Sequence, residues 1–246
     1  MARRPTVIDI PDRAASPRPR SSGRPLVVEL AGLAGSGKST IALELGRLDP
    51  QIQARPRVPG PSHLASVPAL IPTFVRLHRP FRGVLTKEMK RMLHLHALYR
   101  FARGNTGRGA VVFDEGPIYM LARIVVFGGD NIRSRGFERW WWTTVAEWAA
   151  TLDAVVWLDA PDQVLAARVH TRRQRHPLQG ADDGAVTAFF HAYREAFTEV
   201  LDALRVARGP QVWTVATDQA SADQTAGALL ERLHALRAPG PTWERA

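Results

Sequence analysis

Residues 32–39, Gly-Leu-Ala-Gly-Ser-Gly-Lys-Ser, combine glycines, a lysine and a hydroxyl at the spacing of a loop that holds a polyphosphate. The glycines permit backbone angles at which successive N–H groups point into one concavity and surround phosphate oxygens. Lys38 can reach the outer phosphates, and the Ser39 hydroxyl can hold Mg²⁺. The loop residues expected to contact the nucleotide are Gly32, Ala34, Gly35, Ser36, Gly37, Lys38, Ser39 and Thr40.

The residues on either side of this loop support the same interpretation. The apolar run 26–30 precedes it as a buried strand would, and the helical pattern 39–48 follows it. The N-terminal end of such a helix carries a partial positive charge that favours phosphate. Lys38 is one of only three lysines in the chain, so its place in the motif argues against an ordinary glycine-rich turn.

A pair of carboxylates, Asp114 and Glu115, ends the apolar run 110–114. In a parallel sheet, ligands gather at the carboxyl ends of the strands, so these acids are expected beside the phosphate loop. A carboxylate there can organise Mg²⁺ or accept the proton of an attacking hydroxyl. The sequence does not decide which acid has which role. The alternative is an acidic cap before the helical pattern 117–127.

Arginines follow the apolar run 154–159, which leads into a helix start at Asp159-Ala160-Pro161-Asp162. They are Arg168, Arg172, Arg173 and Arg175. Arg168 and Arg172 lie four residues apart and would share one helix face. Arginines that close over a phosphoryl group stabilise the charge that spreads over its oxygens during transfer. The alternative is a solvated basic face in an arginine-rich protein.

The elements that must position these residues can be placed from apolar periodicity. Four short runs have the composition of buried strands, at 26–30, 110–114, 154–159 and 211–216. Helical patterns lie between or after them, at 39–48, 86–102, 117–127, 137–150, 182–207 and 222–237. Strands alternating with helices predict a mostly parallel sheet covered on both faces. A fifth strand would be sought at 50–62, which is a poor strand candidate.

Length and composition limit the classes of protein. The 246 residues are consistent with one compact domain over 25–237, after a disordered arm at 1–24 rich in arginine and proline and before a flexible tail at 238–246. The absence of cysteine excludes disulfides and thiolate zinc sites. No apolar run is long enough for a membrane span or a signal peptide, so we expect a cytoplasmic protein. The net charge is +10, and 30 of the 33 basic residues are arginines. We attribute this excess of arginine to coding bias, so nucleic acid is an unlikely partner.

Taken together, the three sites resemble those of the P-loop kinases of small molecules, in particular the nucleoside and nucleotide kinase group. The resemblance implies an α/β P-loop NTPase fold, with a mostly parallel sheet of about five strands, helices on both faces and an arginine-rich lid. It implies ATP as phosphoryl donor, Mg²⁺ held by Ser39 and Asp114, and transfer to a nucleoside, a nucleotide or a similar hydroxylated metabolite. Lys38 would clamp the phosphates, Asp114 or Glu115 would act as base, and Arg168 and Arg172 would stabilise the transferring group. Further implications are nucleotide contacts from Arg172 and from Thr217, in the loop expected against adenine, and a possible homodimer.

The sequence departs from the family at the acidic motif. Thymidylate and adenylate kinases have Asp-Arg and deoxynucleoside kinases have Glu-Arg where this chain has Asp114-Glu115. No acid between Asp49 and Glu88 can serve as the further glutamate that deoxynucleoside kinases often carry after their second strand. The resemblance therefore supports a kinase better than it supports any one acceptor.

The acceptor is expected to lie among residues between the phosphate loop and Asp114. Basic side chains there would suit an anionic acceptor, or they could be ordinary surface residues: His63, Arg76, His78, Arg79, Arg82, Lys87, His94, His96 and Arg100. Further along the chain, Arg133 and Arg135 could reach an acceptor phosphate. Three consecutive tryptophans, 140–142, cannot all face one core, so at least one should be partly exposed. Its alternative roles are packing, lining of the pocket and burial at a subunit interface.

Two other functions remain open from the residues alone. A nucleotide-dependent regulatory ATPase or GTPase would also need the phosphate loop, although the chain lacks the Asn-Lys-x-Asp stretch usual in guanine-binding switches. A kinase acting on nucleic-acid ends would account for the net charge of +10 and the arginine-rich arm.

Overall fold

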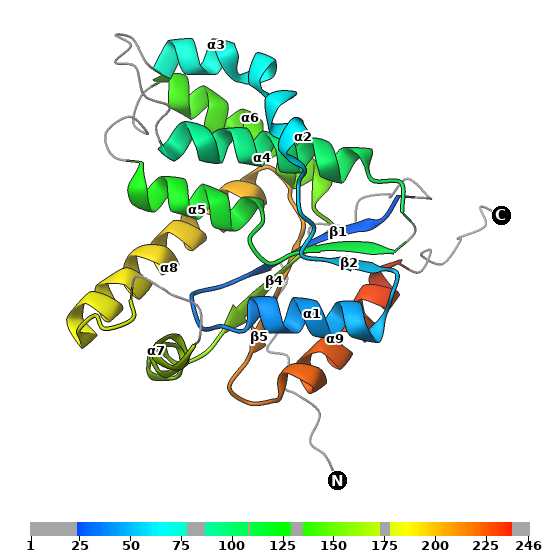
Figure 1. Cartoon of the computed structure of the whole chain (residues 1–246), viewed down its shortest axis with the longest axis vertical. Helices are drawn as coiled ribbons and strands as arrows, with labels where there is room; N and C mark the ends of the chain where they lie inside the picture. Colours follow the sequence, from blue (N-terminus) through cyan, green and yellow to red (C-terminus); the bar gives the residue numbers. More distant parts are fainter. Residues whose placement is uncertain (1–23, 78–86, 108, 129–134, 173–177, 238–246) are drawn as a thin grey trace, which may run out of the picture.

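The computed structural model describes residues 24–77, 87–107, 109–128, 135–172 and 178–237. Its centre is a parallel five-stranded sheet in the order β2-β3-β1-β4-β5 (Figure 1). The strands are β1 (Leu26–Ala31), β2 (Ile52–Ala54), β3 (Ala110–Phe113), β4 (Ala154–Asp159) and β5 (Gln211–Ala216). The four predicted strands are confirmed, and so is the parallel sheet.

Strand β2 supplies the fifth strand inside the region where the sequence offered only a poor candidate. It is three residues long and lies at the sheet edge, where only Ile52 is buried. Its register is set by β3, with Ile52 opposite Ala110. A strand held by one neighbour and one buried side chain leaves almost no periodic pattern in a sequence.

Helices cover both faces of the sheet (Figure 1). Helices α1 (Lys38–Leu48) and α9 (Ala222–Arg237) pack on one face with side chains such as Ile41 and Leu229. The other face is covered by α4 (Lys87–Gly104), α5 (Pro117–Phe127), α6 (Arg135–Thr151) and α8 (Asp183–Val206), and α7 (Asp162–Thr171) follows β4. Each predicted helical range is confirmed to within two residues of these bounds.

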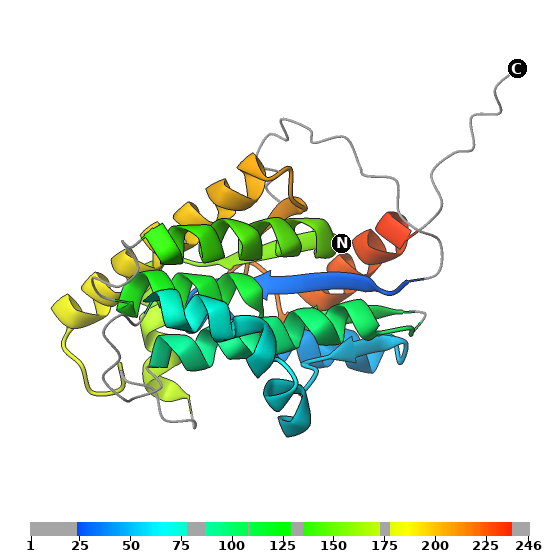
Figure 2. The ribbon, with the colours of Figure 1, turned by 90° about the horizontal axis from the view of Figure 1, so that it is seen from above.

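Two helices have no counterpart in the predictions, α2 (Gly60–Leu64) and α3 (Val67–Leu77). Helix α3 contains Pro72, which removes one helical hydrogen bond and masks the helical pattern. It packs on α4 and α6 as an outer layer (Figures 1 and 2). Among the described residues, none of the helices is sufficiently long and apolar for a membrane crossing.

The tryptophans of α6 divide as the geometry of a helix requires. Trp140 and Trp141 are buried, each beside Phe137, while 45% of Trp142 is exposed. The expectation that at least one of the three is exposed is confirmed. The predicted arm, except for Arg24, and the predicted tail lie outside the described residues. Arg24 pairs with Asp153 at 2.8 Å.

Candidate functional site

The phosphate loop joins β1 to α1 at the carboxyl edge of the sheet. Gly32 has a φ of 147°, and a Cβ there would lie 2.3 Å from the carbonyl oxygen of Leu158. A Cβ on Gly35 would lie 2.5 Å from the carbonyl oxygen of Leu165. Any side chain at either position would therefore push the loop away from β4 and α7, so the two glycines set the shape of the loop.

Lys38 lies across this loop. Its Nζ donates hydrogen bonds of 2.8 Å to the carbonyl oxygens of both Gly32 and Leu33. Burial lowers the pKa of Lys38 to about 8, against the opposing effect of the acids Glu115, Asp114 and Glu29. A partly desolvated ammonium attracts phosphate more strongly than one in water, because less solvent screens its charge.

Asp114 is 7% exposed and lies beside the start of α1. Ser39 Oγ donates a 2.6 Å hydrogen bond to Asp114 Oδ2, and Arg55 Nε lies 2.7 Å from the same oxygen. A hydroxyl and a carboxylate in contact offer the hard oxygen ligands that Mg²⁺ prefers, so the residues present fit this ion. Glu115 is exposed and lines the cavity described below.

Sequence reasoning did not find Arg55. This residue follows β2 with a left-handed φ of 50°, and its backbone N–H donates to Val112 O at 2.9 Å. The backbone turn brings the guanidinium back toward the end of β3. One indication in the sequence was the absence of an acid between Asp49 and Glu88. The structure places a basic residue, Arg55, directly after the second strand.

Arg168 lies within α7 and bridges three parts of the site. It donates to Thr217 Oγ1 at 3.1 Å, to Thr217 O at 2.8 Å and to Gly35 O at 3.3 Å. The guanidinium therefore ties α7 to the phosphate loop and to the loop after β5. Arg172 lines the same cavity, but it follows the helix as its extended C-cap residue, so the two arginines do not share one helix face as predicted. Arg173 and Arg175 lie outside the described residues.

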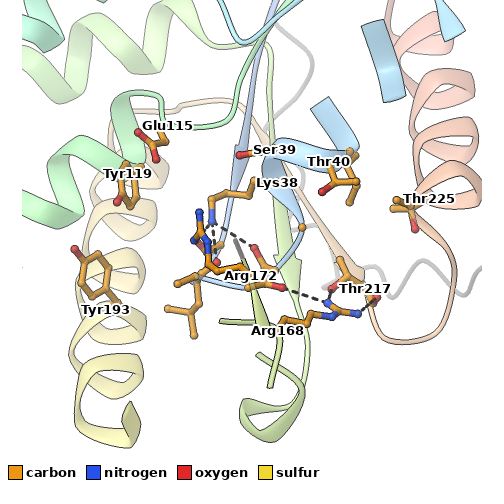
Figure 3. A pocket seen from close by; sticks show the side chains of 18 of the residues that line it. Lys38, Ser39, Thr40, Glu115, Tyr119, Arg168, Arg172, Tyr193, Thr217 and Thr225 are labelled. Atoms are coloured by element: carbon orange, nitrogen blue, oxygen red, sulfur yellow. Dashed lines mark hydrogen bonds between the residues drawn. The ribbon is translucent and has the colours of Figure 1, made fainter. Parts of the chain in front are cut away.

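A cavity of about 890 Å³ opens above the phosphate loop (Figure 3). Residues 32–41 line it, with Glu115, Arg168 and Arg172 at its sides. Thr217, Ser221 and Thr225 line the side toward β5 and α9. The opposite side is aromatic and comes from α5 and α8: Tyr119, Phe189 and Tyr193. Sequence reasoning missed this aromatic side, because the three residues are ordinary members of amphipathic helices and only the fold brings them together.

Arginines lie over two aromatic rings of α5, one of which, that of Tyr119, lines the cavity. Arg123 lies over the ring of Tyr119 at 5.6 Å, and Arg91 over the ring of Phe127 at 5.5 Å. Burial raises the pKa of Tyr193 to about 12. The tyrosines therefore stay protonated near neutral pH and can donate hydrogen bonds.

The other basic residues expected near the acceptor do not form one group. His63 Nε2 lies 2.9 Å from His94 Nδ1, which joins α2 to α4, and Arg100 donates to Ala65 O at 2.6 Å. His96 lines a separate cavity of about 280 Å³ between α3, α4 and α6. Of the remaining candidates, His78, Arg79, Arg82 and Arg133 lie outside the described residues, and the side chain of Arg76 is not described. Lys87 and Arg135 are exposed at the starts of α4 and α6.

No protein-family model and no curated protein matches the sequence. Among solved structures, the chain is similar to thymidylate kinase from Candida albicans at 15% identity and a TM-score of 0.55, over 89% of this chain and 96% of that one. It is also similar to deoxyadenosine kinase from M. mycoides at 13% identity and a TM-score of 0.52, over 86% and 100% of the two chains. At these identities the likeness establishes the fold alone: the chain has the fold of these two kinases, as the sequence motifs implied.

Proposed function

We propose that this protein is an ATP- and Mg²⁺-dependent phosphotransferase that moves the γ-phosphate to a hydroxyl of a small acceptor. The acceptor would be a nucleoside, a nucleotide or a similar hydroxylated metabolite. The observation that carries the proposal is the contact of Ser39 Oγ with Asp114 Oδ2 at 2.6 Å, beside the cavity that Ser39, Lys38 and Glu115 line. It joins the phosphate loop to the acidic motif in the arrangement that phosphoryl transfer needs.

Two carboxylates with different surroundings suggest two roles. Asp114 is nearly buried, and its Oδ2 contacts both Ser39 and Arg55, so we assign it to organising Mg²⁺ beside the Ser39 hydroxyl. Mg²⁺, when bound, would neutralise charge on the outer phosphates. Glu115 is exposed and faces the cavity, so we assign it as the base for the acceptor hydroxyl.

In this reaction one bond forms, one breaks and one proton moves. The acceptor oxygen forms a bond to the γ-phosphorus, the bond from that phosphorus to the β,γ-bridging oxygen breaks, and Glu115 takes the hydroxyl proton. Lys38 and Arg172 stabilise the charge on the phosphate oxygens. Arg168 is bonded to Thr217 and Gly35, so we assign it to holding the nucleotide loops together.

Release of ADP from Mg-ATP, measured against pooled acceptors, tests the proposal. The pools are nucleosides, nucleoside monophosphates, sugars, amino-sugar antibiotics and 5′-hydroxyl oligonucleotides. We expect one pool to raise ADP release above the water background in the wild type and in Lys90→Ala, since Lys90 is an exposed lysine of α4. Lys38→Ala should lose at least about 100-fold in kcat, because one preorganised charge contributes this much to transfer.

Two outcomes would contradict the proposal. One is equal transfer by Lys38→Ala and the wild type. The other is a flat rate across every pool from a protein that binds Mg-ATP, together with hydrolysis that a protein partner activates. Phosphorylation of the oligonucleotide pool alone would assign the protein to nucleic-acid ends.

A further inference from the structure

Glu29 is an acidic residue within the central strand β1. It is 0% exposed and lies opposite Phe113 of β3 and Val155 of β4. Alternate residues of a strand point to the same face, so its side chain lies on the side of Val27 and Ala31, which pack beneath α4, α5, α6 and α8. A charged side chain is rarely buried so completely unless it has a specific partner.

The partner is the first turn of α5. Oε2 of Glu29 accepts the N–H of Ile118 at 2.8 Å, and Oε1 accepts the N–H of Tyr119 at 2.9 Å. Helix α5 has Gly116 as its N-cap residue and Pro117 at its first position, so neither supplies a capping side chain. The N–H groups of a first helical turn have no partner inside the helix and need one from elsewhere. Glu29 supplies it from a strand 89 residues earlier in the chain.

Gly116 leaves the room that this contact needs. A Cβ at Gly116 would lie 2.8 Å from Oε2 of Glu29 and 2.8 Å from the Cβ of Phe113. The carboxyl group therefore packs directly against the backbone of the turn that carries Asp114 and Glu115. Gly116 has an ordinary extended φ of −92°, so the backbone itself does not require glycine there. The close fit against Glu29 does require it.

The turn from Asp114 to Gly116 is consequently fixed to β1 at both of its ends. Before it, the β-ladder holds Phe113 opposite Glu29. After it, the Glu29 carboxyl group holds the first turn of α5. The same strand β1 ends at Ala31, two residues after Glu29, and the phosphate loop begins at Gly32. One strand thus sets the position of both the phosphate loop and the acidic turn.

We propose that Glu29 is a positioning residue, which holds Asp114 and Glu115 in place relative to Ser39 and Lys38. Its role in catalysis rests on the proposed phosphotransfer, whereas its hold on the acidic turn does not. Glu29 is not among the residues that line the cavity, so we assign it no direct contact with the nucleotide or the acceptor.

Substitutions at Glu29 should change the rate of transfer and leave nucleotide affinity alone. Above about pH 8, where Glu29 is ionised, both of its oxygens can accept a backbone N–H. In assays at such a pH, Glu29→Gln keeps the size and one acceptor oxygen but turns an amide N–H₂ toward a backbone N–H, whereas Glu29→Leu removes both acceptors. We expect kcat to fall by about 10-fold in the Gln variant and about 100-fold in the Leu variant, since small misplacements cost this much. The KM for ATP should stay within about twofold, because the phosphate loop itself is unchanged.

Asp153→Asn is the matched control. Asp153 is also a buried carboxylate that accepts a backbone N–H of β1, from Val27 at 2.8 Å, and it pairs with Arg24. Asp153 lies at the amino ends of the strands, away from the phosphate loop, because it directly precedes β4 and contacts the start of β1. This variant should lose stability and keep its kcat.

Hydrogen exchange measured by mass spectrometry gives a readout that needs no acceptor. Peptides over 114–122 should exchange faster in Glu29→Gln and Glu29→Leu than in the wild type or Asp153→Asn, while peptides from β4 keep their protection. Unchanged exchange over 114–122 in the Gln variant would overturn the proposal, whatever the wild type phosphorylates. So would faster exchange with an unchanged kcat, or an equal fall of kcat in Asp153→Asn. If Glu29→Leu does not fold, the Gln variant alone decides.

Discussion

Replacing Glu29 by glutamine should change how the stability of the protein depends on pH. Burial raises the pKa of Glu29 from 4.5 to about 8, although the N–H groups of Gly116, Ile118 and Tyr119 and the charge of Lys38 act to lower it. The folded state thus binds this proton more tightly than the unfolded state does. The free energy of unfolding therefore falls as the pH rises from about 4.5 to about 8.

The size of the effect follows from the two pKa values. One unit is about 1.4 kcal/mol, so between pH 5 and 7.5 the contribution of Glu29 becomes less favourable by about 3 kcal/mol. Lys38 adds little in this range: its pKa is lowered to about 8, so it is mostly protonated both folded and unfolded below that pH. Glu29→Gln cannot ionise and shows no such change.

Urea unfolding of the wild type and Glu29→Gln at pH 5, 6, 7 and 7.5 measures this difference. The other titrating groups cancel when the two proteins are compared at each pH. The wild type should lose about 3 kcal/mol relative to the variant across the series. Parallel stability curves for the two proteins would refute the reasoning, because they would mean that Glu29 has the same pKa in the folded and unfolded states.

Four further substitutions have expected outcomes. Gly116→Ala should destabilise the protein by about 1–3 kcal/mol in thermal or urea unfolding, because its Cβ would lie 2.8 Å from neighbouring atoms. Gly227→Ala is the control within α9. It should stabilise the protein by up to about 1 kcal/mol, because no atom lies within 4 Å of the added Cβ. Arg168→Ala should weaken ATP binding about 10-fold by calorimetry, since it removes the hydrogen bonds between α7 and the two nucleotide loops; unchanged affinity would contradict this role. Arg55→Ala should lower kcat more than it changes ATP affinity, because Asp114 loses a 2.7 Å partner; an effect on affinity alone would assign Arg55 to the nucleotide.

The features that could be predicted from the sequence are those formed by residues close together in the chain. The phosphate loop is eight consecutive residues between a strand and a helix, so local spacing alone identifies it. Strands β1 and β3 are buried at every position, and β4 and β5 are buried or half-buried, so all four form apolar runs that local composition records. The acidic motif needed one further step, since parallel strands must bring their carboxyl ends to one edge.

Tertiary structure decided the features that join distant parts of the chain. Strand β2 exists because it pairs with β3, and the aromatic side of the cavity exists because α5 packs on α8. Glu29 appears in the sequence as an acid interrupting an apolar run, and only the position of α5, 89 residues later, shows what it binds. Such contacts depend on packing between elements, and a single sequence carries no periodic signal for them.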